Sequence, residues 1–338
     1  MRESRLKLAF LGCGGIARQH WRGIQGIATR VDVVACIDIN EDAAADMARE
    51  TGGAAFTTFE LANKNCEFDA VDIMLPHNRH EDAVLDCFSA GKHVLLEKPI
   101  AHTLESCERI LTEASKADKV FMIAEQAQYW PDIIKARELI DENAIGRPLM
   151  ASGNFYDRTF VPEDGSIPWR FKKDLAGGGV TMDGGAHWIR PLRMMMGEIE
   201  EVIGVIGNHI PQMETESFSQ VLIRFAKGTT GVLTCMNVTA AAAPVDMFRI
   251  TGTEGELVIT GGPRGKLILY NTHHRKGHAV MDAVEGKRAS YGAEIKDFSE
   301  AVLDGKPFAA PPEYALGELR TALALYRSVE SRSWEKVW

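Results

Sequence analysis

The chain has 338 residues, of which 45% are hydrophobic and 25% are charged. This composition excludes an intrinsically disordered protein, and the length predicts about two folded domains. Asp and Glu total 47 against 38 Lys and Arg, so the formal net charge is -9. Because neither sign of charge forms a long run, and a polyphosphate backbone attracts basic surfaces, nucleic acid is not an expected partner.

The six cysteines are widely spaced and form no C-x-x-C pair, so we expect reduced, buried thiols. No apolar run approaches the ~20 residues that span a bilayer. Near the N-terminus, the run Leu6–Leu11 is interrupted by Lys7 and is shorter than the ~7 residues of a signal-peptide core. We therefore expect it to be the first core strand of a cytoplasmic protein without a membrane partner.

Up to about residue 125, short apolar runs alternate with amphipathic helical stretches. This alternation is typical of α/β folds and predicts a Rossmann-type, doubly wound parallel sheet with helices on both faces. The predicted strands are Leu6–Leu11, Val31–Ile37, Ala70–Leu75, His93–Leu96 and Val120–Ala124. The predicted helices are Glu41–Glu50, His80–Ala90 and Leu104–Ala117, the last capped by Thr103.

From residue 126 to residue 338 we predict a second, α+β domain. After a helical stretch at Trp130–Asn143, strands follow one another with few helices between them, which favours an open-faced, mostly antiparallel sheet. The predicted strands begin near Leu149 and continue with Val202–Gly207, Ser217–Phe225, Gly231–Val238, Met247–Thr251, Glu256–Ile259 and Lys266–Tyr270. Two late helices follow, Ala293–Leu303 and Ala315–Ser331, and the terminal one can pack back on the first domain.

Apolar residues alternate only loosely in Val221–Phe225. We therefore expect helices on one face of this sheet and a partner subunit on the other, which predicts a homodimer or homotetramer.

A glycine-rich turn directly follows the first strand and opens a helix. Its residues fit G-x-G-x-x-A: Gly12, Cys13, Gly14, Gly15, Ile16 and Ala17. Such a turn brings backbone amides and a helix N-terminus to a pyrophosphate. The second strand ends in Asp38, which is placed to bind the adenosine ribose, and Ile39 and the next two residues include no Arg for a 2′-phosphate. We expect NAD rather than NADP; the alternative is an ordinary turn with a helix-capping Asp.

Three further residues are suited to oxidising an alcohol. Lys98 follows the fifth strand, at the edge where such sheets bind ligands, although it could also be a solvated lysine. Asp183 and His187 are four residues apart and would share a face if the backbone there is helical. An imidazole can take the hydroxyl proton while an ammonium stabilises the alkoxide. The alternative is a capping Asp and a core His, and Pro191 requires the helix to start near His187 or to kink.

Several ordered motifs resemble the Gfo/Idh/MocA oxidoreductase family over nearly the whole chain. They are the Gly12–Ala17 turn, Pro76-His77-Asn78-Arg79-His80, Glu97-Lys98-Pro99, Trp169-Arg170 before Gly177-Gly178-Gly179, the Asp183/His187 pair, and Ile250–Gly255. The resemblance implies a Rossmann domain and an open-faced sheet domain, with Lys98, Asp183 and His187 as the catalytic triad. It also implies cofactor contacts from Pro76, His77, His80, Glu97, Lys98, Gln126, Trp169 and Arg170.

Three positions depart from the pattern of the family. His77 replaces a usual Asn, Arg190 stands where an Asp is common, and Gln128 replaces a frequent Arg. The departure at Arg190 predicts a reversed charge beside the site. The identity of the substrate therefore cannot be transferred from any one relative.

The leading hypothesis is an NAD-dependent oxidoreductase that acts on a secondary hydroxyl of a sugar, glycoside or cyclitol. The predicted substrate residues are Lys98, Tyr156, Arg158, Arg170, Asp183 and His187. One alternative is glycoside cleavage by transient oxidation and elimination, and another is a regulator that binds dinucleotide without catalysis. We expect no metal, because His273, His274 and His278 lie in a loop sequence without a carboxylate partner.

Overall fold

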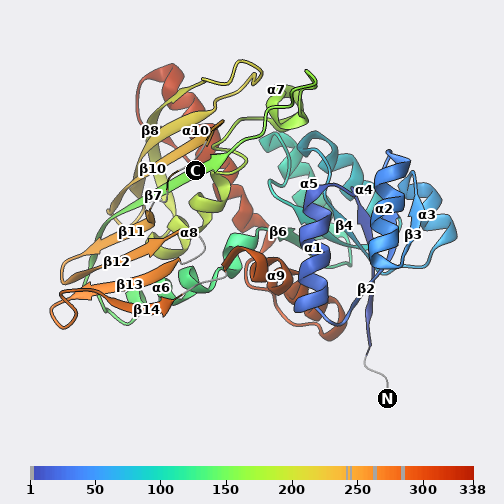
Figure 1. The fold of residues 1–338 in the computed structure, drawn as a ribbon, viewed down its shortest axis with the longest axis horizontal. Helices are drawn as coiled ribbons and strands as arrows, with labels where there is room; N and C mark the ends of the chain where they lie inside the picture. The colour runs from blue at the N-terminus through green and yellow to red at the C-terminus, as the bar shows by residue number, and fades with distance from the viewer. Residues whose placement is uncertain (1–3, 241–242, 244–245, 262–264, 283–285) are drawn as a thin grey trace. The chain divides into compact units, whose positions relative to one another are not determined.

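The computed structural model describes residues 4–240, 243, 246–261, 265–282 and 286–338. The chain forms two compact units, each built on one sheet (Figure 1). The first contains Met1–Gln126 and Lys287–Ala315, and the second contains Ala127–Gly286 and Leu316–Trp338. Residues 287–315 thus belong to the first unit, which differs from the predicted division of the chain at residue 125.

A six-stranded sheet forms the first unit, and all its strands are parallel. Its strands are β1 (Leu6–Leu11), β2 (Val31–Ile37), β3 (Ala54–Phe56), β4 (Ala70–Ile73), β5 (His93–Glu97) and β6 (Phe121–Ala124). Its helices are α1 (Gly15–Gly26), α2 (Glu41–Thr51), α3 (Phe59–Asn65), α4 (His80–Ser89), α5 (Leu104–Lys116) and α9 (Gly286–Asp304). In the order β3-β2-β1-β4-β5-β6, the chain first proceeds outward from β1 to β3 and then outward on the other side from β4 to β6. The switch point between β1 and β4 is where doubly wound sheets bind ligands. The predicted Rossmann fold is confirmed.

Helix α9 packs into the first unit against α1. A Cβ added to Gly23 of α1 would lie 2.6 Å from the backbone nitrogen of Gly292, so the two backbones approach closely. Glu294 of the same helix lies 3.6 Å from the buried ring of His20. Periodicity shows that a helix is amphipathic but not which sheet it covers, which is why the sequence misassigns this helix.

The second unit contains a nine-stranded sheet in the order β14-β13-β12-β11-β7-β10-β9-β8-β15. Its strands are β7 (Pro148–Arg158), β8 (Ile199–Gly207), β9 (Phe218–Phe225), β10 (Thr230–Val238), β11 (Asp246–Gly252), β12 (Gly255–Thr260), β13 (Lys266–Asn271), β14 (His278–Asp282) and β15 (Glu335–Lys336). Within this sheet, only β7 and β10 pair in parallel among its described strands, so the predicted mostly antiparallel sheet is confirmed. The prediction of His278 as a loop residue is wrong, because it begins β14.

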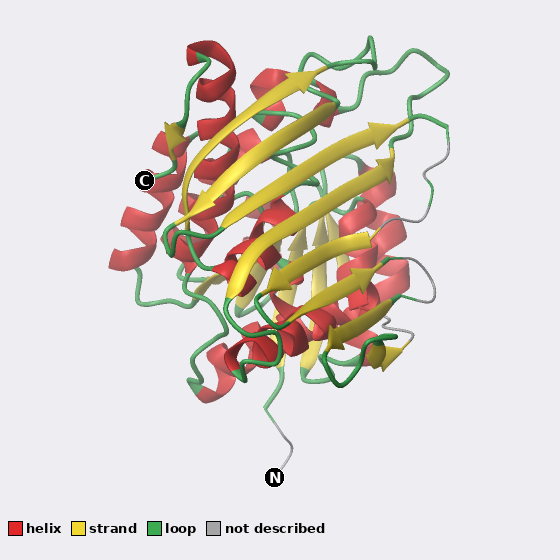
Figure 2. Cartoon of the chain, turned by 90° about the vertical axis from the view of Figure 1, so that its left-hand side faces the viewer, coloured by secondary structure: helices red, strands yellow, loops and turns green. Residues whose placement is uncertain are grey.

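Helices cover one face of this sheet, and Figure 2 shows its other face toward the viewer. The covering helices are α6 (Pro131–Asp141), α8 (Ala186–Met196) and α10 (Leu316–Ser331), and the unit also contains the short helix α7 (Lys173–Ala176). Along β9, buried residues alternate strictly with exposed or half-buried ones, as expected for a sheet with one covered face. The Trp188 ring of α8 lies 4.8 Å from that of Phe155 and stacks on Phe248 at 5.9 Å. The terminal helix α10 also belongs to the second unit, where it packs on β8.

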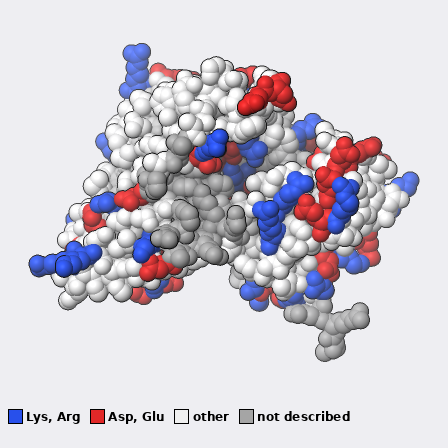
Figure 3. All heavy atoms as spheres, in the orientation of Figure 1, with Lys and Arg blue, Asp and Glu red and all other residues white. Residues whose placement is uncertain are grey.

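The surface is mixed in charge. On the face shown in Figure 3, acidic and basic side chains are interspersed, with no continuous basic stripe among the described residues. No helix within the described ranges is both long and apolar enough to cross a membrane. All six cysteines are free thiols; five are buried, and Cys66 is half-buried.

Candidate functional site

The turn after β1 has the geometry that a pyrophosphate site requires. Gly12 has φ +99°, and an added Cβ would lie 2.5 Å from the carbonyl oxygen of Met74, so only glycine fits. By contrast, an added Cβ at Gly14 or Gly15 would meet nothing within 4 Å. No side chain caps the N-terminus of α1, and its first turn has no acidic residue. These open amides fit the pyrophosphate of NAD.

Asp38 directly follows β2, beside this turn. One carboxylate oxygen accepts a hydrogen bond from the amide of Cys13 at 2.8 Å, and the other accepts from the amide of Asn40 at 2.9 Å. The structure therefore joins the predicted ribose-binding carboxylate to the glycine turn. Ile39 is 93% exposed, and no basic residue stands there to receive a 2′-phosphate.

The loop after β4 carries Pro76, His77 and His80 to the same edge of the sheet. His80 is wholly buried; its Nδ1 lies 2.9 Å from the carbonyl oxygen of Pro99, and its Nε2 lies 2.9 Å from that of Leu75. Burial lowers the pKa of His80. Because carbonyl oxygens of both loops lie at its two ring nitrogens, this side chain bridges the two loops, and its contact with the cofactor stays a prediction. The His77 ring lies beside it, 5.7 Å away, and is also buried.

Glu97 and Lys98 lie at the end of β5. A carboxylate oxygen of Glu97 accepts a hydrogen bond from the Lys98 amide at 3.1 Å. The Lys98–Pro99 peptide bond is cis. Gln126, the remaining predicted cofactor residue of this unit, is buried and accepts a hydrogen bond from the hydroxyl of Ser290 at 2.7 Å.

A buried cluster of ionisable groups lies behind Glu97. The ring of His20 contacts Asp72 at 2.7 Å through Nδ1 and Glu97 at 3.1 Å through Nε2. Burial disfavours charge on His20, but these carboxylates outweigh it and raise its pKa well above the usual value. Burial raises the pKa of Asp72 and of Glu294 as well. The sequence contains no signal for this cluster, because its members come from different strands and helices.

In the second unit, Asp183 lies in a turn and α8 begins at Ala186. The helix therefore starts near His187, one of the two options that Pro191 leaves open, and Asp183 is outside it. A carboxylate oxygen of Asp183 accepts a hydrogen bond from Arg170 Nε at 3.1 Å. The guanidinium of Arg170 also stacks on Trp169 at 4.3 Å. The structure thus brings Arg170 and Trp169 together with Asp183, which lies four residues before His187 in the sequence.

Tyr156 and Arg158 are not grouped with these residues. Phe155, which directly precedes Tyr156, faces the core and contacts Trp188 of α8. Since side chains alternate along a strand, Tyr156 and Arg158 point to the opposite face of the sheet, and both are exposed. The sequence could not show this, because the register of β7 decides it.

Arg190 does not reverse the charge of the site as predicted. Its side chain is 2% exposed and forms two hydrogen bonds to the carboxylate of Glu318, at 2.9 and 2.8 Å. The paired carboxylate neutralises the guanidinium within the core of the second unit.

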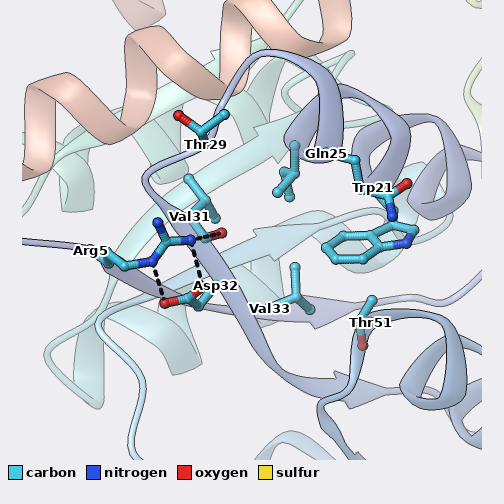
Figure 4. A pocket seen from close by; sticks show the side chains of 9 residues that line it. Arg5, Trp21, Gln25, Thr29, Val31, Asp32, Val33 and Thr51 are labelled. Atoms are coloured by element: carbon cyan, nitrogen blue, oxygen red, sulfur yellow. Dashed lines mark hydrogen bonds and ion pairs between the residues drawn. The ribbon is translucent and has the colours of Figure 1, made fainter.

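Two other features lie outside this site. The His274 ring stacks on that of His278 at 4.7 Å, and the described residues contain no group of three or more His, Cys, Asp or Glu arranged for a metal ion. A cavity of about 300 Å³ opens between α1 and β2, where Arg5 pairs with Asp32 at 2.7 Å (Figure 4). It lies at the amino end of β2, whereas nucleotides bind at the carboxyl ends of the strands.

Comparisons with known proteins agree with this geometry. The family model described as an oxidoreductase family with an NAD-binding Rossmann fold matches residues 6–125, and the GFO/IDH/MocA C-terminal domain matches residues 133–258. The chain is 25% identical to levoglucosan dehydrogenase of Pseudarthrobacter phenanthrenivorans over 89% of its length and 88% of that protein. It is 24% identical to myo-inositol 2-dehydrogenase of Thermotoga maritima, over 97% of each chain.

Solved structures show the same fold. Levoglucosan dehydrogenase in complex with NADH and levoglucosan superposes with a TM-score of 0.90 at 22% identity, covering 99% of this chain and 100% of that one. An oxidoreductase from Thermotoga maritima superposes with a TM-score of 0.84 at 27% identity, covering 98% of each chain. Since the matched family models cover most of its length, the chain belongs to the Gfo/Idh/MocA family of oxidoreductases and carries that family's NAD-binding Rossmann domain.

Proposed function

We propose that this protein is an NAD-dependent dehydrogenase that oxidises a secondary hydroxyl of a sugar, glycoside or cyclitol. The observation that carries the proposal is the Arg170–Asp183 pair directly ahead of His187, in a chain that also retains the nucleotide turn and Lys98. A carboxylate held by an arginine and followed by an imidazole provides the acid/base part of alcohol oxidation. A dinucleotide-binding regulator has no need for Lys98 or for this pair.

The proposed roles follow from the chemistry of each group. NAD, when bound, accepts the hydride from the carbinol carbon. His187 takes the hydroxyl proton, since an imidazole can both accept and release a proton. Lys98 places an ammonium near the reacting oxygen and stabilises the developing alkoxide. Asp183 orients the imidazole, and Arg170 holds Asp183.

The substrate class rests on relatives and on the groups beside Asp183. The relatives include a levoglucosan dehydrogenase, a myo-inositol 2-dehydrogenase and a 1,5-anhydro-D-fructose reductase. Trp169 and Arg170 would offer an aromatic face and a cation to a polyhydroxylated ring. We do not include Tyr156 and Arg158 in the proposed pocket, because they point to the other face of the sheet.

That other face supports a homo-oligomer. It exposes the apolar side chains of Met150, Tyr156, Val205 and Leu222, a pattern that favours burial against a second copy. Light scattering on the wild type and on Leu222→Glu tests this: a dimer or tetramer that dissociates in the variant is expected, and a monomeric wild type would contradict it.

The function is tested by mixing the protein with NAD and a panel of anhydrosugars, inositols, aldoses and chromogenic glycosides. Dehydrogenation predicts accumulation of NADH in proportion to the oxidised substrate. Release of the chromogenic group without net NADH would instead establish the cleavage reaction. A regulator would be favoured if the protein binds NAD but neither oxidises any of these compounds nor reduces keto sugars with NADH.

A further inference from the structure

One buried carboxylate holds the glycine-rich segment 177–185 that precedes α8. Glu216, just before β9, is 6% exposed. Its Oε2 accepts a hydrogen bond from the amide of Gly179 at 2.9 Å, and its Oε1 accepts from the amide of Thr181 at 3.0 Å. Its own backbone carbonyl accepts from the amide of Val180 at 3.0 Å. A single residue therefore binds three consecutive amides of the segment.

Tyr326 of α10 completes the surroundings of this carboxylate. Its hydroxyl donates to Oε1 of Glu216 at 2.9 Å. Burial raises the pKa of Glu216, and the hydrogen bonds from the Thr181 amide and the Tyr326 hydroxyl oppose that rise. The carboxylate thus receives three donors in a site from which water is largely excluded, where each hydrogen bond is strong and costly to break.

The glycines of the segment allow this close approach. A Cβ added to Gly179 would lie 2.6 Å from Oε2 of Glu216. A Cβ added to Gly178 would collide with the Tyr326 hydroxyl. Side chains at either position would push the segment off the carboxylate, so Gly178 and Gly179 are explained by their contacts with Tyr326 and Glu216, while Gly177 ends α7 with φ +81°.

The anchored amides lead directly to the proposed acid/base pair. The carbonyl of Gly179 accepts from the amide of Asp183 at 3.0 Å, and the carbonyl of Val180 accepts from that of Gly185 at 2.7 Å. Helix α8 begins at the next residue, Ala186, and His187 follows. The segment bound by Glu216 is therefore the one that sets where Asp183 lies and where α8 starts.

We propose that Glu216 is a positioning residue for Asp183 and His187, acting through the amides of the segment 179–181. This inference rests on the proposed function of that pair. Misplacement of a catalytic group by ~1 Å can lower the rate by about a hundredfold. Glu216 needs no contact with substrate for this role, because it acts through the backbone.

The test is Glu216→Gln, which keeps the shape of the side chain but turns one acceptor into a donor facing backbone amides. We expect kcat to fall by at least about tenfold, with the KM for NAD unchanged because the first unit is untouched. Tyr326→Phe removes one donor and should cause a smaller loss. In both variants, hydrogen exchange should accelerate in residues 177–187 and stay unchanged in the Rossmann domain.

The matched control is Thr321→Ala, which removes a buried hydrogen bond from the same helix, to the carbonyl of Gly317, without touching the segment. It should lower the melting temperature and leave kcat within about twofold. The inference is overturned if Glu216→Gln keeps wild-type kcat, or if Thr321→Ala lowers kcat equally at the same loss of stability. If the wild type oxidises no compound, the proposed function fails, and the exchange data alone decide whether Glu216 holds the segment.

Discussion

Arg190 donates a hydrogen bond from Nη1 to the side-chain oxygen of Gln128 at 3.0 Å. These are two of the three positions at which the sequence departs from the pattern expected from its resemblance to the family. The two departures are therefore in contact, and the positive charge expected at position 128 is present at position 190 instead. Glu318 of α10 supplies the carboxylate that Arg190 requires, so the change is accommodated within the core of the second unit.

This pairing predicts a large effect of Arg190→Met on stability. Removing the guanidinium leaves Glu318 buried with Arg193 as its remaining ionic partner, and breaking a buried pair costs about 3 kcal/mol. Urea unfolding should show this loss. Arg249→Met, at an exposed pair with Asp246, is the control and should cost less than ~1 kcal/mol. Equal losses in the two variants would contradict the assignment.

The first unit follows closely from its sequence, because its strands are buried apolar runs with clear turns between them. β1 and β2 have the predicted bounds, and the Asn40 and Thr103 caps start α2 and α5. The short strand β3 and helix α3 were not predicted. β3 has only three residues and is exposed or half-buried at the edge of the sheet, so it lacks the periodicity that identifies a strand.

The site follows from sequence only where a motif fixes the local backbone. The Gly12–Ala17 turn and Asp38 lie together as predicted. The bond between Arg170 and Asp183, the anchoring by Glu216 and the direction of Tyr156 depend on contacts between distant elements. One sequence contains no signal for such contacts, because each of these residues is an ordinary polar residue in its local context.

Gly12 and Gly14 should respond differently to substitution by alanine. Gly12→Ala forces a side chain onto a positive φ and against Met74, so both the melting temperature and NAD affinity should fall. Gly14→Ala meets no protein atom within 4 Å, so the fold should keep its stability while the new methyl group weakens NAD binding. Calorimetric titration with NAD and thermal unfolding test this. Normal NAD affinity in Gly14→Ala would argue against pyrophosphate binding at this turn.

Cofactor choice should depend on Asp38. Its carboxylate would repel a 2′-phosphate, so kcat/KM should be higher with NAD than with NADP. Asp38→Ser should narrow that difference, chiefly by weakening the use of NAD. Steady-state kinetics with both cofactors checks this. A wild type that uses NADP as well as NAD would contradict the role of Asp38.

The buried cluster around His20 predicts that stability falls as pH rises above neutrality. The pKa of His20 is raised, so its stabilisation is present below its unfolded value and is lost as pH rises through the folded value. The raised pKa values of Glu294 and Asp72 act in the same direction. His80 and His93 have lowered pKa values. They therefore add stability as pH rises only up to their unfolded pKa of about 6.5, and they do not change the slope above it.

Glu294→Gln should reduce this slope, because it removes one carboxyl group that must ionise in the buried cluster. The control is Glu300→Gln on the same helix, where the carboxylate pairs with Lys306 at 3.1 Å at the surface and the slope should not change. Melting temperatures between about pH 7 and 8.5 measure it. A flat wild-type profile over that range would show that the cluster does not titrate there.

The proposed roles of Lys98 and His187 predict separate losses of chemistry and binding. Lys98→Met and His187→Ala should each lower kcat by about a hundredfold or more, while the Kd for NAD stays within about threefold of wild type. Arg249→Met serves again as a control with normal turnover. Either variant retaining full turnover would reject the role assigned to that residue.

The most direct test of the central claim is to follow deuterium from a substrate labelled at its carbinol carbon. A dehydrogenase that transfers hydride predicts one deuterium in the reduced nicotinamide ring for each molecule of ketone formed, detected by mass spectrometry, and a strong loss of this transfer in His187→Ala. Ketone without deuterium in the cofactor, or no oxidation of any sugar, glycoside or cyclitol, would contradict the account.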